Sequence, residues 1–310
     1  MRTITVVGSF VMDMIGTVDK FPLEGETVIG KTLKTFPGGK GANQAVAAAR
    51  LGGKVNMIGM VGKDDFGNTF KSLFKDENID ITHVLTSETE PTAVGLIQIN
   101  SLGENKIVVI PGANYEYSIE DLEEVREVLK NSNLVMTQLE LKHEVTFKLI
   151  RICHELNVPL ILNPAPAIEI PKEYLEKITY LTPNETELEI LTGIRVDSME
   201  SVKEATRKLL DLGVKNVIGT LGSKGAIIGN NNGFQHIEGY KVDVVDTVGA
   251  GDSFNGALAY CIVEGYSLPE AVKYSNAVGA LAVTKHGAIP SLPRKEEVEE
   301  LISGKGFPLN

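Results

Sequence analysis

The strongest constraint on the fold is the alternation of strand-like and helix-like segments along the 310-residue chain. Strands that alternate with helices of about 10 to 15 residues build βαβ units, which give a mostly parallel sheet covered by helices on both faces. We find no repeat and no low-complexity linker, so we expect a single α/β domain over residues 1–310. The predicted strands are 4–8, 55–61, 134–136, 159–162 and 215–220, and the predicted helices are 43–51, 66–76, 120–130 and 145–156.

Two pairs of predicted strands break this alternation, because no helix separates their members. The first pair is 14–18 with 27–36, and the second is 92–100 with 106–110. Without helices these strands cannot join the parallel sheet. We expect a small antiparallel β sheet, formed by about 14–36 and 91–111, that acts as a lid over the mouth of a cleft. Its predicted apolar face, which a homodimer would cover, comprises Val28, Leu33, Val94, Leu96 and Ile97.

The composition limits the possible partners. The formal net charge is −11 and the pI is near 5.1. Binding to nucleic acid or to an anionic membrane needs a net basic face, so both partners are disfavoured. No apolar stretch approaches the ~18 residues of a membrane-spanning helix. Cys153 and Cys261 lie in apolar helical patterns without a metal-ligand spacing, which favours buried reduced thiols and a cytoplasmic location.

A glycine-rich turn at residues 246–254 combines an anion-binding backbone with a carboxylate. Residues 240–245 alternate like a strand, and residues 254–263 have the character of a helix. Backbone N–H groups at such a helix start form a positive concavity suited to an anion. Asp252 places a carboxylate there, as a kinase needs in order to take a proton from an attacking hydroxyl. The alternative is that Asp252 only caps the helix.

A second glycine-rich loop precedes an alanine-rich helix within residues 37–51. Its glycines Gly38, Gly39 and Gly41 let the backbone approach a ligand. Lys40 and Asn43 offer side-chain donors. Two such loops, far apart in the sequence, suggest the two halves of a cleft that holds a donor and an acceptor.

Two other nucleotide-binding patterns are not supported. Residues 25–32 match a P-loop, but the segments that flank them are extended or broken by proline, rather than a buried strand and a helix. No GxGxxG motif opens a helix after a strand, which disfavours a nicotinamide-dependent dehydrogenase.

Five motifs in order make the chain similar to the ribokinase-type members of the PfkB carbohydrate-kinase family. They occupy residues 38–43, 138–140, 163–167, 182–187 and 246–252, and the likeness runs from residue 7 to about residue 293. The resemblance implies a ribokinase-like α/β fold and phosphoryl transfer from ATP to a sugar. It also implies Mg2+ and K+ as metal cofactors.

Positions that match the family motifs imply the catalytic and sugar-binding residues. Asp252 matches the general base that takes the proton of the sugar's primary hydroxyl. Gly249, Ala250 and Gly251 match the anion hole that stabilises the transferring phosphoryl group. Without the resemblance, Glu140 also fits a surface carboxylate at a strand end. The implied sugar-binding set is Val11, Met12, Asp13, Gly39, Lys40, Gly41, Ala42, Asn43, Glu140 and Asp252.

Further matching positions imply sites for the nucleotide and for cations. Asn184 and Glu187 match the element that positions the phosphates and Mg2+, Glu187 through water, although Asn184 also fits a helix cap. The implied nucleotide-binding set continues with Thr220, Leu221, Gly222, Ser223, Lys224, Gly225, Gly251, Asp252 and Asn276, of which 222–225 also fit a hairpin turn. The implied monovalent-cation site comprises Asp246, Val248, Ala282, Lys285, Gly287 and Ser291.

One position departs from the family pattern. Ribokinases often carry Asn two residues before the sugar-binding Asp, whereas here Val11 precedes Asp13. Valine cannot hydrogen-bond a hydroxyl, and such a bond contributes roughly 0.5–1.5 kcal/mol. An apolar residue at this position resembles deoxyribokinase. We expect ATP-dependent phosphorylation of the 5-hydroxyl of D-ribose, with 2-deoxyribose as the alternative sugar and a non-catalytic sugar sensor as the alternative class.

Overall fold

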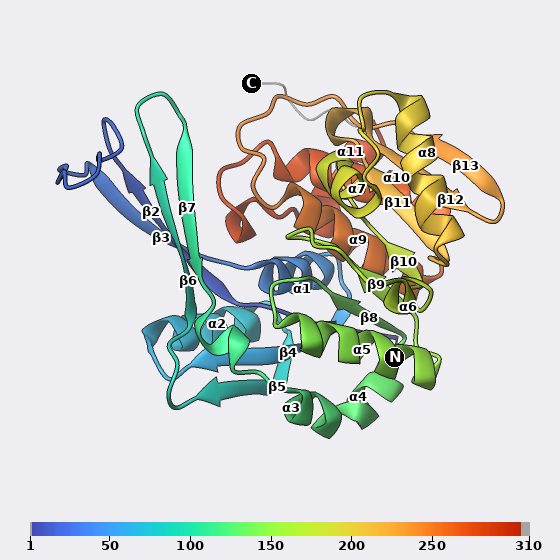
Figure 1. Cartoon of the computed structure of the whole chain (residues 1–310), viewed down its shortest axis with the longest axis horizontal. Helices are drawn as coiled ribbons and strands as arrows, with labels where there is room; N and C mark the ends of the chain where they lie inside the picture. Colours follow the sequence, from blue (N-terminus) through green and yellow to red (C-terminus); the bar gives the residue numbers. More distant parts are fainter. Residues whose placement is uncertain (1, 305–310) are drawn as a thin grey trace.

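The computed structural model describes residues 2–304, and its main feature is a nine-stranded sheet between two layers of helices (Figure 1). The strands are β1 (Thr3–Val7), β4 (Lys54–Gly62), β5 (Asp80–Ser87), β8 (Leu134–Thr137), β9 (Leu160–Leu162), β10 (Tyr180–Leu181), β11 (Asn216–Thr220), β12 (Ala226–Asn230) and β13 (Gly233–Ile237). Their order is β13-β12-β11-β10-β9-β8-β1-β4-β5. Strands β11 to β5 in this order are parallel, and β12 and β13 add antiparallel at one edge. The predicted mostly parallel sheet is confirmed.

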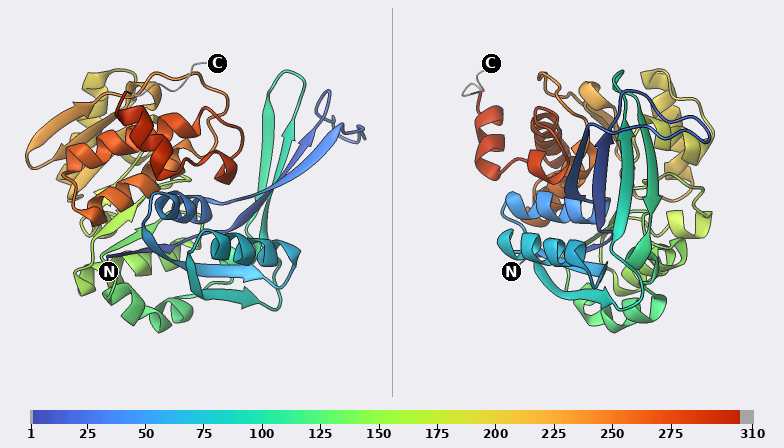
Figure 2. Two further views of the ribbon diagram at one scale, coloured as in Figure 1. Left: turned by 180° about the vertical axis from the view of Figure 1, so that it is seen from behind. Right: turned by 90° about the vertical axis from the view of Figure 1, so that its left-hand side faces the viewer.

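Two groups of helices cover the two faces of this sheet (Figure 2). Ile4 and Val6 of β1 pack into one hydrophobic core, whereas Val7 packs into the other, because successive residues of a strand point to opposite faces. The first core includes α1 (Lys40–Arg50), α2 (Asp65–Asp76), α9 (Ala250–Glu264), α10 (Leu268–Ala282) and α11 (Lys295–Ile302). The second includes α3 (Ile119–Glu124), α4 (Arg126–Lys130), α5 (His143–Leu156), α6 (Lys172–Leu175), α7 (Glu185–Thr192) and α8 (Met199–Asp211).

None of the helices within residues 2–304 is long and apolar enough to span a membrane.

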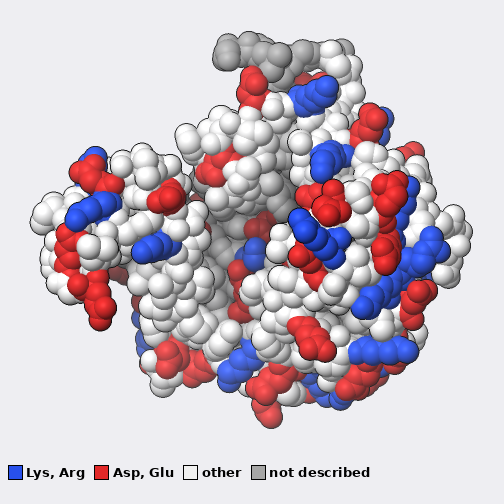
Figure 3. All heavy atoms as spheres, turned by 45° about the horizontal axis from the view of Figure 1, so that its top comes forward, with Lys and Arg blue, Asp and Glu red and all other residues white. Residues whose placement is uncertain are grey.

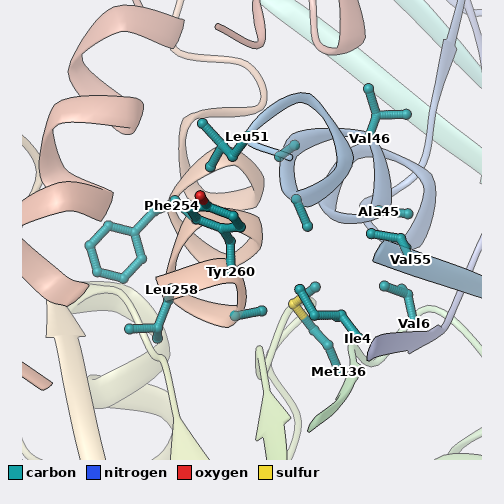
Figure 4. Close-up of a cluster of buried hydrophobic side chains, with 14 of the residues drawn as sticks. Ile4, Val6, Ala45, Val46, Leu51, Val55, Met136, Phe254, Leu258 and Tyr260 are labelled. Carbon is teal, nitrogen blue, oxygen red and sulfur yellow. The ribbon is translucent and has the colours of Figure 1, made fainter. Parts of the chain in front are cut away.

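Helices α1 and α9 pack together on one face of the sheet (Figure 4), and their contact brings the two glycine-rich loops together. Gly256 of α9 lies where the helices touch. A Cβ atom there would lie 2.6 Å from the Cβ of Ala47 and 2.7 Å from the carbonyl oxygen of Gln44, so only glycine permits this approach. Asp252 lies one turn earlier in α9, and the close packing therefore places it beside the first turn of α1.

A second sheet projects from the body, at the left of Figure 1. It consists of β2 (Val11–Thr17), β3 (Thr32–Gly38), β6 (Ala93–Ile99) and β7 (Asn105–Ile110) in the order β3-β2-β6-β7. The two predicted hairpins are antiparallel, whereas β2 and β6 at the centre run parallel. We call this element the small sheet.

The small sheet has an inner face that carries Asp13 and an outer face that is partly apolar. The predicted apolar residues that share the outer face are Leu33, Val94 and Leu96. The assignment of Ile97 to that face is wrong. Ile97 pairs with Ile15, which lies two residues after Asp13 in β2 and therefore shares the inner face with it. Val28 precedes β3 and lies outside the sheet.

Two further predictions about local structure are wrong. Residues 240–245 do not form a strand and pair with no strand of either described sheet, and Val244 is 62% exposed. The backbone N–H groups of Val245 and Asp246 instead donate to the carbonyl of Val283, at 2.8 and 3.1 Å, where α10 ends. The predicted helix 120–130 is divided at Val125 into α3 and α4.

Candidate active site

The two glycine-rich loops each end at a helix start. Helix α1 begins at Lys40 after Gly39, whose φ is 88°, and α9 begins at Ala250 after Gly249, whose φ is 79°. Such positive φ values favour glycine. A Cβ on Gly39 would also lie 2.7 Å from the backbone nitrogen of Val11, so this glycine lets the loop lie against β2.

The carboxylate of Asp252 lies between the two helix starts. Asp252 is 7% exposed and sits in the first turn of α9. Its Oδ2 accepts a hydrogen bond from Asn43 Nδ2 at 2.8 Å, and its Oδ1 accepts one from Gln44 Nε2 at 2.9 Å. The alternative that Asp252 caps its own helix is wrong, because its side chain is directed to α1 and the N-cap residue is Gly249.

Glu140, at the carboxyl end of β8, is bonded to the start of α1. Its Oε2 accepts hydrogen bonds from Ser9 Oγ at 2.5 Å and from the backbone N–H of Lys40 at 2.9 Å. Ser9 Oγ in turn accepts the N–H of Gly41 at 3.2 Å. Both hydrogen bonds of Glu140 therefore use Oε2, and within the described part of the chain no group is hydrogen-bonded to Oε1. Glu140 is therefore not a free surface carboxylate.

Lys40 is the cationic centre of an acidic site. Burial opposes its charge, but the carboxylates of Asp252, Glu140, Glu187 and Asp13 outweigh that effect and raise the pKa of Lys40. Burial, with repulsion from Glu140, raises the pKa of Asp13 to about 6. Burial also raises the pKa of Glu140 and that of Glu187. The five charged groups are therefore close enough to one another to interact electrostatically.

Figure 3 shows a hollow between the small sheet and the body, with both acidic and basic atoms on its walls. On the inner face of the small sheet, Val11 and Asp13 lie in alternate positions of β2. Val11 is 6% exposed and would contact a Cβ on Gly95, the residue paired with Asp13. An apolar side chain therefore lies beside the carboxylate of Asp13.

Two residues of the implied sugar-binding set have side chains that point elsewhere. Met12 is 2% exposed and packs in the hydrophobic core, because it lies between Val11 and Asp13 on the opposite face of β2. Ala42 is fully buried in the same core. Only the backbone of these two residues can face a ligand.

Asn184 and Glu187 form the capping box of α7. Asn184 Oδ1 accepts the N–H of Glu187 at 2.8 Å, and Glu187 Oε2 accepts the N–H of Asn184 at 2.9 Å. The helix-cap interpretation of Asn184 is confirmed. The carboxylate of Glu187 also interacts electrostatically with Lys40 and Asp252, so this cap borders the same hollow.

Residues 220–225 connect β11 to β12. Gly222–Lys224 form a 3-10 turn and the two strands pair antiparallel, which confirms the hairpin interpretation. Leu221 is 2% exposed and belongs to the core, so only its backbone can face a ligand. Lys224 is exposed, with its Nζ 3.5 Å from Glu185 Oε1 at the start of α7.

Asn276 of α10 is 8% exposed and is hydrogen-bonded to the end of β13 and the residue after it. Its Nδ2 donates to the carbonyl oxygens of Ile237 and Glu238 at 3.2 and 3.1 Å. Asn276 therefore fixes the position of the chain at residues 237–238.

Asp246 joins the two loops that contain the implied monovalent-cation ligands. Its Oδ1 accepts the N–H of Val248 at 3.0 Å, and its Oδ2 accepts the N–H of Gly287 at 2.9 Å. Ser291 is fully buried and donates its hydroxyl to the carbonyl of Ala288 at 2.8 Å. Residues 246–248 and 287–291 are therefore brought together.

The sequence motifs missed four polar residues that support this site, namely Ser9, Gln44, Gln138 and Asn163. Gln44 bonds Asp252, Asn163 and Gln138, and Ser9 bonds Glu140. Two of the four, Gln138 and Asn163, lie inside the recognised motifs, and Gln44 directly follows another, so these positions were visible in the sequence. Their partners were not, because side-chain hydrogen bonds over more than 90 residues depend on the packing of α1 against α9 and β8.

Comparisons with known proteins agree with this architecture. A model of the pfkB family carbohydrate kinases matches residues 1–295. A ribokinase of Haemophilus influenzae is 39% identical over 301 residues, covering 97% of this chain and 98% of that protein. A deoxyribokinase of Salmonella typhi is also 39% identical, over 302 residues, with 97% and 98% covered.

The solved structures show the same similarity. The structure of Arabidopsis thaliana ribokinase complexed with ribose and ATP has a TM-score of 0.92 and 34% identity, covering 97% of this chain and 99% of that chain. A ribokinase crystal structure from Thermotoga maritima has a TM-score of 0.90 and 37% identity, with 98% and 100% covered. The motifs, the fold and these matches over nearly the whole length lead to one conclusion: this chain belongs to the pfkB family of carbohydrate kinases.

Proposed function

We propose that this protein transfers the γ-phosphoryl group of ATP to the 5-hydroxyl of D-ribose, giving ribose 5-phosphate. The observation that carries the proposal is the buried carboxylate of Asp252, held at the start of α9 by the side chains of Asn43 and Gln44. A carboxylate at a helix N-terminus lies where an anionic phosphoryl group is also stabilised. Ribokinase relatives at 39% identity and a neighbouring structure with ribose and ATP support this choice of substrates.

The sugar side of the site pairs acceptors with donors. Asp13 and the second oxygen of Glu140 accept hydrogen bonds from ring hydroxyls, and Lys40 donates. Asn43 Oδ1 is buried and has no partner among the described residues, so it accepts a hydroxyl as well. Gly39 and Gly41 let the loop lie directly against the backbone of residues 8–11, and the backbones of Met12 and Ala42 complete the wall. An unpaired buried acceptor next to the base favours a polar ligand there.

Phosphoryl transfer uses the base and the helix start together. Asp252 takes the proton from the 5-hydroxyl as that oxygen attacks the γ-phosphorus. The N–H groups of Gly249, Ala250 and Gly251 stabilise the charge that spreads over the phosphoryl oxygens. The positive end of α9 adds to this stabilisation, because the first-turn N–H groups of a helix have no partners within the helix.

The nucleotide and Mg2+ are assigned to the wall formed by α7, the 220–225 turn and α10. Glu187 would hold Mg2+ through water, and Asn184 orients Glu187 through the capping box. Within residues 2–304, no group of three or more His, Cys, Asp or Glu side chains suits a metal ion. One carboxylate fits Mg2+, which binds mainly to substrate phosphates and water and neutralises phosphate charge. The nucleotide contacts come from Thr220, Leu221, Gly222, Ser223, Lys224, Gly225 and Asn276.

A monovalent cation, K+, is assigned to the loops that Asp246 joins. The hydrogen bonds of Asp246 bring the two loops together, and the carboxylate of Asp246, with backbone carbonyls of these loops, would supply the oxygen ligands that such an ion needs. K+ bound there would add positive charge beside the anion hole. The ligands in this proposal are Asp246, Val248, Ala282, Lys285, Gly287 and Ser291.

We further propose that the small sheet is the lid of a single domain spanning residues 1–310, and that two lids pair in a homodimer. The outer face of the lid exposes Leu33, Leu96, Val108 and Ile110 at 66%, 41%, 59% and 43%. Exposed apolar side chains that share one face of a sheet mark a surface that a partner covers. A cytoplasmic location is supported by the free, buried thiols of Cys153 and Cys261.

A second candidate substrate is 2-deoxyribose. Val11 lies on the inner face beside Asp13, where an apolar side chain accepts a carbon without a hydroxyl. A deoxyribokinase relative has the same identity to this chain as the ribokinase relative, 39%.

The test is a panel of pentoses and hexoses with ATP and Mg2+, read by ADP release and by the phosphorylated product. We expect ribose 5-phosphate as the main product, and a higher rate with K+ than with Na+. A kcat/KM more than tenfold higher for 2-deoxyribose than for ribose would select the second candidate. If ATP is not consumed with any of the sugars, both candidate substrates are ruled out.

A further inference from the structure

Gln44 is the most completely bonded polar side chain beside the proposed base. It is fully buried in α1. Its Nε2 donates to Asp252 Oδ1 at 2.9 Å and to Asn163 Oδ1 at 3.1 Å, and its Oε1 accepts from Gln138 Nε2 at 2.7 Å. Both amide hydrogens and the carbonyl are thus used by the protein. Gln44 has no hydrogen left for a ligand, so its role lies in the groups that it holds.

The direction of this chain of amides is set by the carboxylate at its end. An ionised carboxylate only accepts hydrogen bonds, so Gln44 must turn its nitrogen toward Asp252. The oxygen of Gln44 then faces Gln138, which must turn its own nitrogen toward Gln44. Gln138 Oε1 is left buried and without a partner among the described residues. An orphaned acceptor is unfavourable, which indicates that the orientation is imposed by the charge on Asp252.

We propose that Gln44 is a positioning residue for Asp252 and that Gln138 sets the polarity of Gln44; the inference rests on the proposed phosphoryl transfer. Asn43 donates to Oδ2 while Gln44 donates to Oδ1, so each oxygen of Asp252 has one fixed donor. Two donors in fixed places hold the plane of the carboxylate. The attacking hydroxyl then meets a base that is already oriented.

A purely structural role for Gln44 makes a different prediction. If its amide only fills space between α1, α9 and β8, its removal lowers thermal stability and leaves the ionisation of the base unchanged. The charged groups that act on Asp252 across the site are Lys40, Asp13, Glu140 and Glu187. Neither Gln44→Met nor Gln138→Met alters any of them, so a change in the pH profile of these two variants reports the lost donor.

The first variants are Gln44→Met and Gln44→Glu. For Gln44→Met we expect kcat with ribose to fall about tenfold to a hundredfold, as for loss of a hydrogen bond to a charged group, with KM for ribose within about threefold. The acid limb of kcat against pH should move to higher pH, because the base loses a donor. Gln44→Glu keeps the shape but places a second carboxyl against Asp252. Because neighbouring carboxyls share a proton, its kcat should be lower still at pH 7 and recover as the pH rises.

Gln138→Met and Leu209→Ala complete the design. Gln138→Met should move the acid limb in the same direction by a smaller amount, because Gln44 stays in place but loses the group that orients it. Leu209 is fully buried in α8, away from the site, so Leu209→Ala should lower the Tm and leave the acid limb unchanged.

The outcomes separate the two hypotheses. If Gln44→Met loses Tm but keeps the acid limb and kcat of the wild type, as Leu209→Ala does, the positioning role is overturned. If Gln44→Met does not fold, Gln138→Met, which adds no charge, decides by the same pH profile: an acid limb and kcat like those of the wild type would overturn the positioning role. A wild-type protein that phosphorylates no sugar would instead overturn the proposed function.

Discussion

Asn43 Nδ2 donates a hydrogen bond to Asp252 Oδ2 across 2.8 Å, although 209 positions separate the two residues in the sequence. This bond joins the first turn of α1 to the first turn of α9. The loop assigned to the sugar therefore holds the residue assigned to deprotonate it. A change that moves α1 should consequently affect both sugar binding and catalysis.

Ribose binding should weaken below pH 6, because Asp13 must be ionised to accept hydrogen bonds from hydroxyls. Burial and the neighbouring carboxylate of Glu140 raise the pKa of Asp13 to about 6. We expect the Kd for ribose, measured by calorimetry, to rise severalfold between pH 7.5 and pH 5. In Asp13→Asn the affinity should be lower at both pH values and nearly independent of pH. The same pH dependence in the variant as in the wild type would show that another group is responsible.

The same substitution should stabilise the protein without ligand. A carboxyl whose folded pKa lies above its unfolded value of 3.8 contributes stability below pH 3.8, and that contribution is lost as the pH rises through 6. At pH 7.5, Asp13→Asn should therefore raise the free energy of unfolding by roughly 1 to 3 kcal/mol. Urea denaturation at pH 7.5 and 4.5 checks this, and the gain should shrink at the lower pH.

Val11→Asn should increase the preference for ribose over 2-deoxyribose. Val11 lies beside Asp13 on the inner face of the small sheet, and asparagine can hydrogen-bond a hydroxyl there. We expect the ratio of kcat/KM values for the two sugars to move about tenfold toward ribose, the effect of one hydrogen bond. Val11→Ala, which adds no polar group, is the matched control. An unchanged ratio in Val11→Asn would place the sugar's 2-position away from this residue.

Charged residues on the outer face of the small sheet should weaken the proposed dimer. Leu96 and Val108 are neighbours across the β6–β7 pair and are 41% and 59% exposed. The double variant Leu96→Lys/Val108→Lys places two like charges on the apolar outer face, and we expect its dimer Kd to rise at least about tenfold. Sedimentation velocity measures this. Ile190→Lys is the control, since Ile190 is 53% exposed on α7, outside the small sheet.

The sequence predicted the main sheet because each βαβ unit is a local pattern. It also predicted the two hairpins, whose strands are close in the sequence. The parallel pairing of Val11 with Ala93 joins the hairpins across about 80 residues and has no local signal. Residues 240–245 alternate like a strand, but alternation alone cannot show whether a sheet edge is available.

The site was predicted only in part, because the sequence shows local motifs but not which distant segments come into contact. The family resemblance predicted Asp13, Lys40, Asn43 and Asp252 as site residues, and in the structure these residues lie near one another. The alternation along β2 already implies that Met12 and Asp13 point in opposite directions, and the motif match overlooked it. The bonds of Gln44 could not be predicted, because they require the close contact that Gly256 permits between α1 and α9.

The central claim is that Asp252 is the base that activates the sugar hydroxyl. The most direct measurement compares ATP-dependent turnover with ribose binding in Asp252→Asn, an isosteric variant without the negative charge. We predict that kcat falls by about 10²- to 10⁴-fold or more, as for loss of a general base, while the Kd for ribose stays within about fivefold and the Tm shows a folded protein. A folded variant that phosphorylates ribose with the kcat of the wild type would contradict the account.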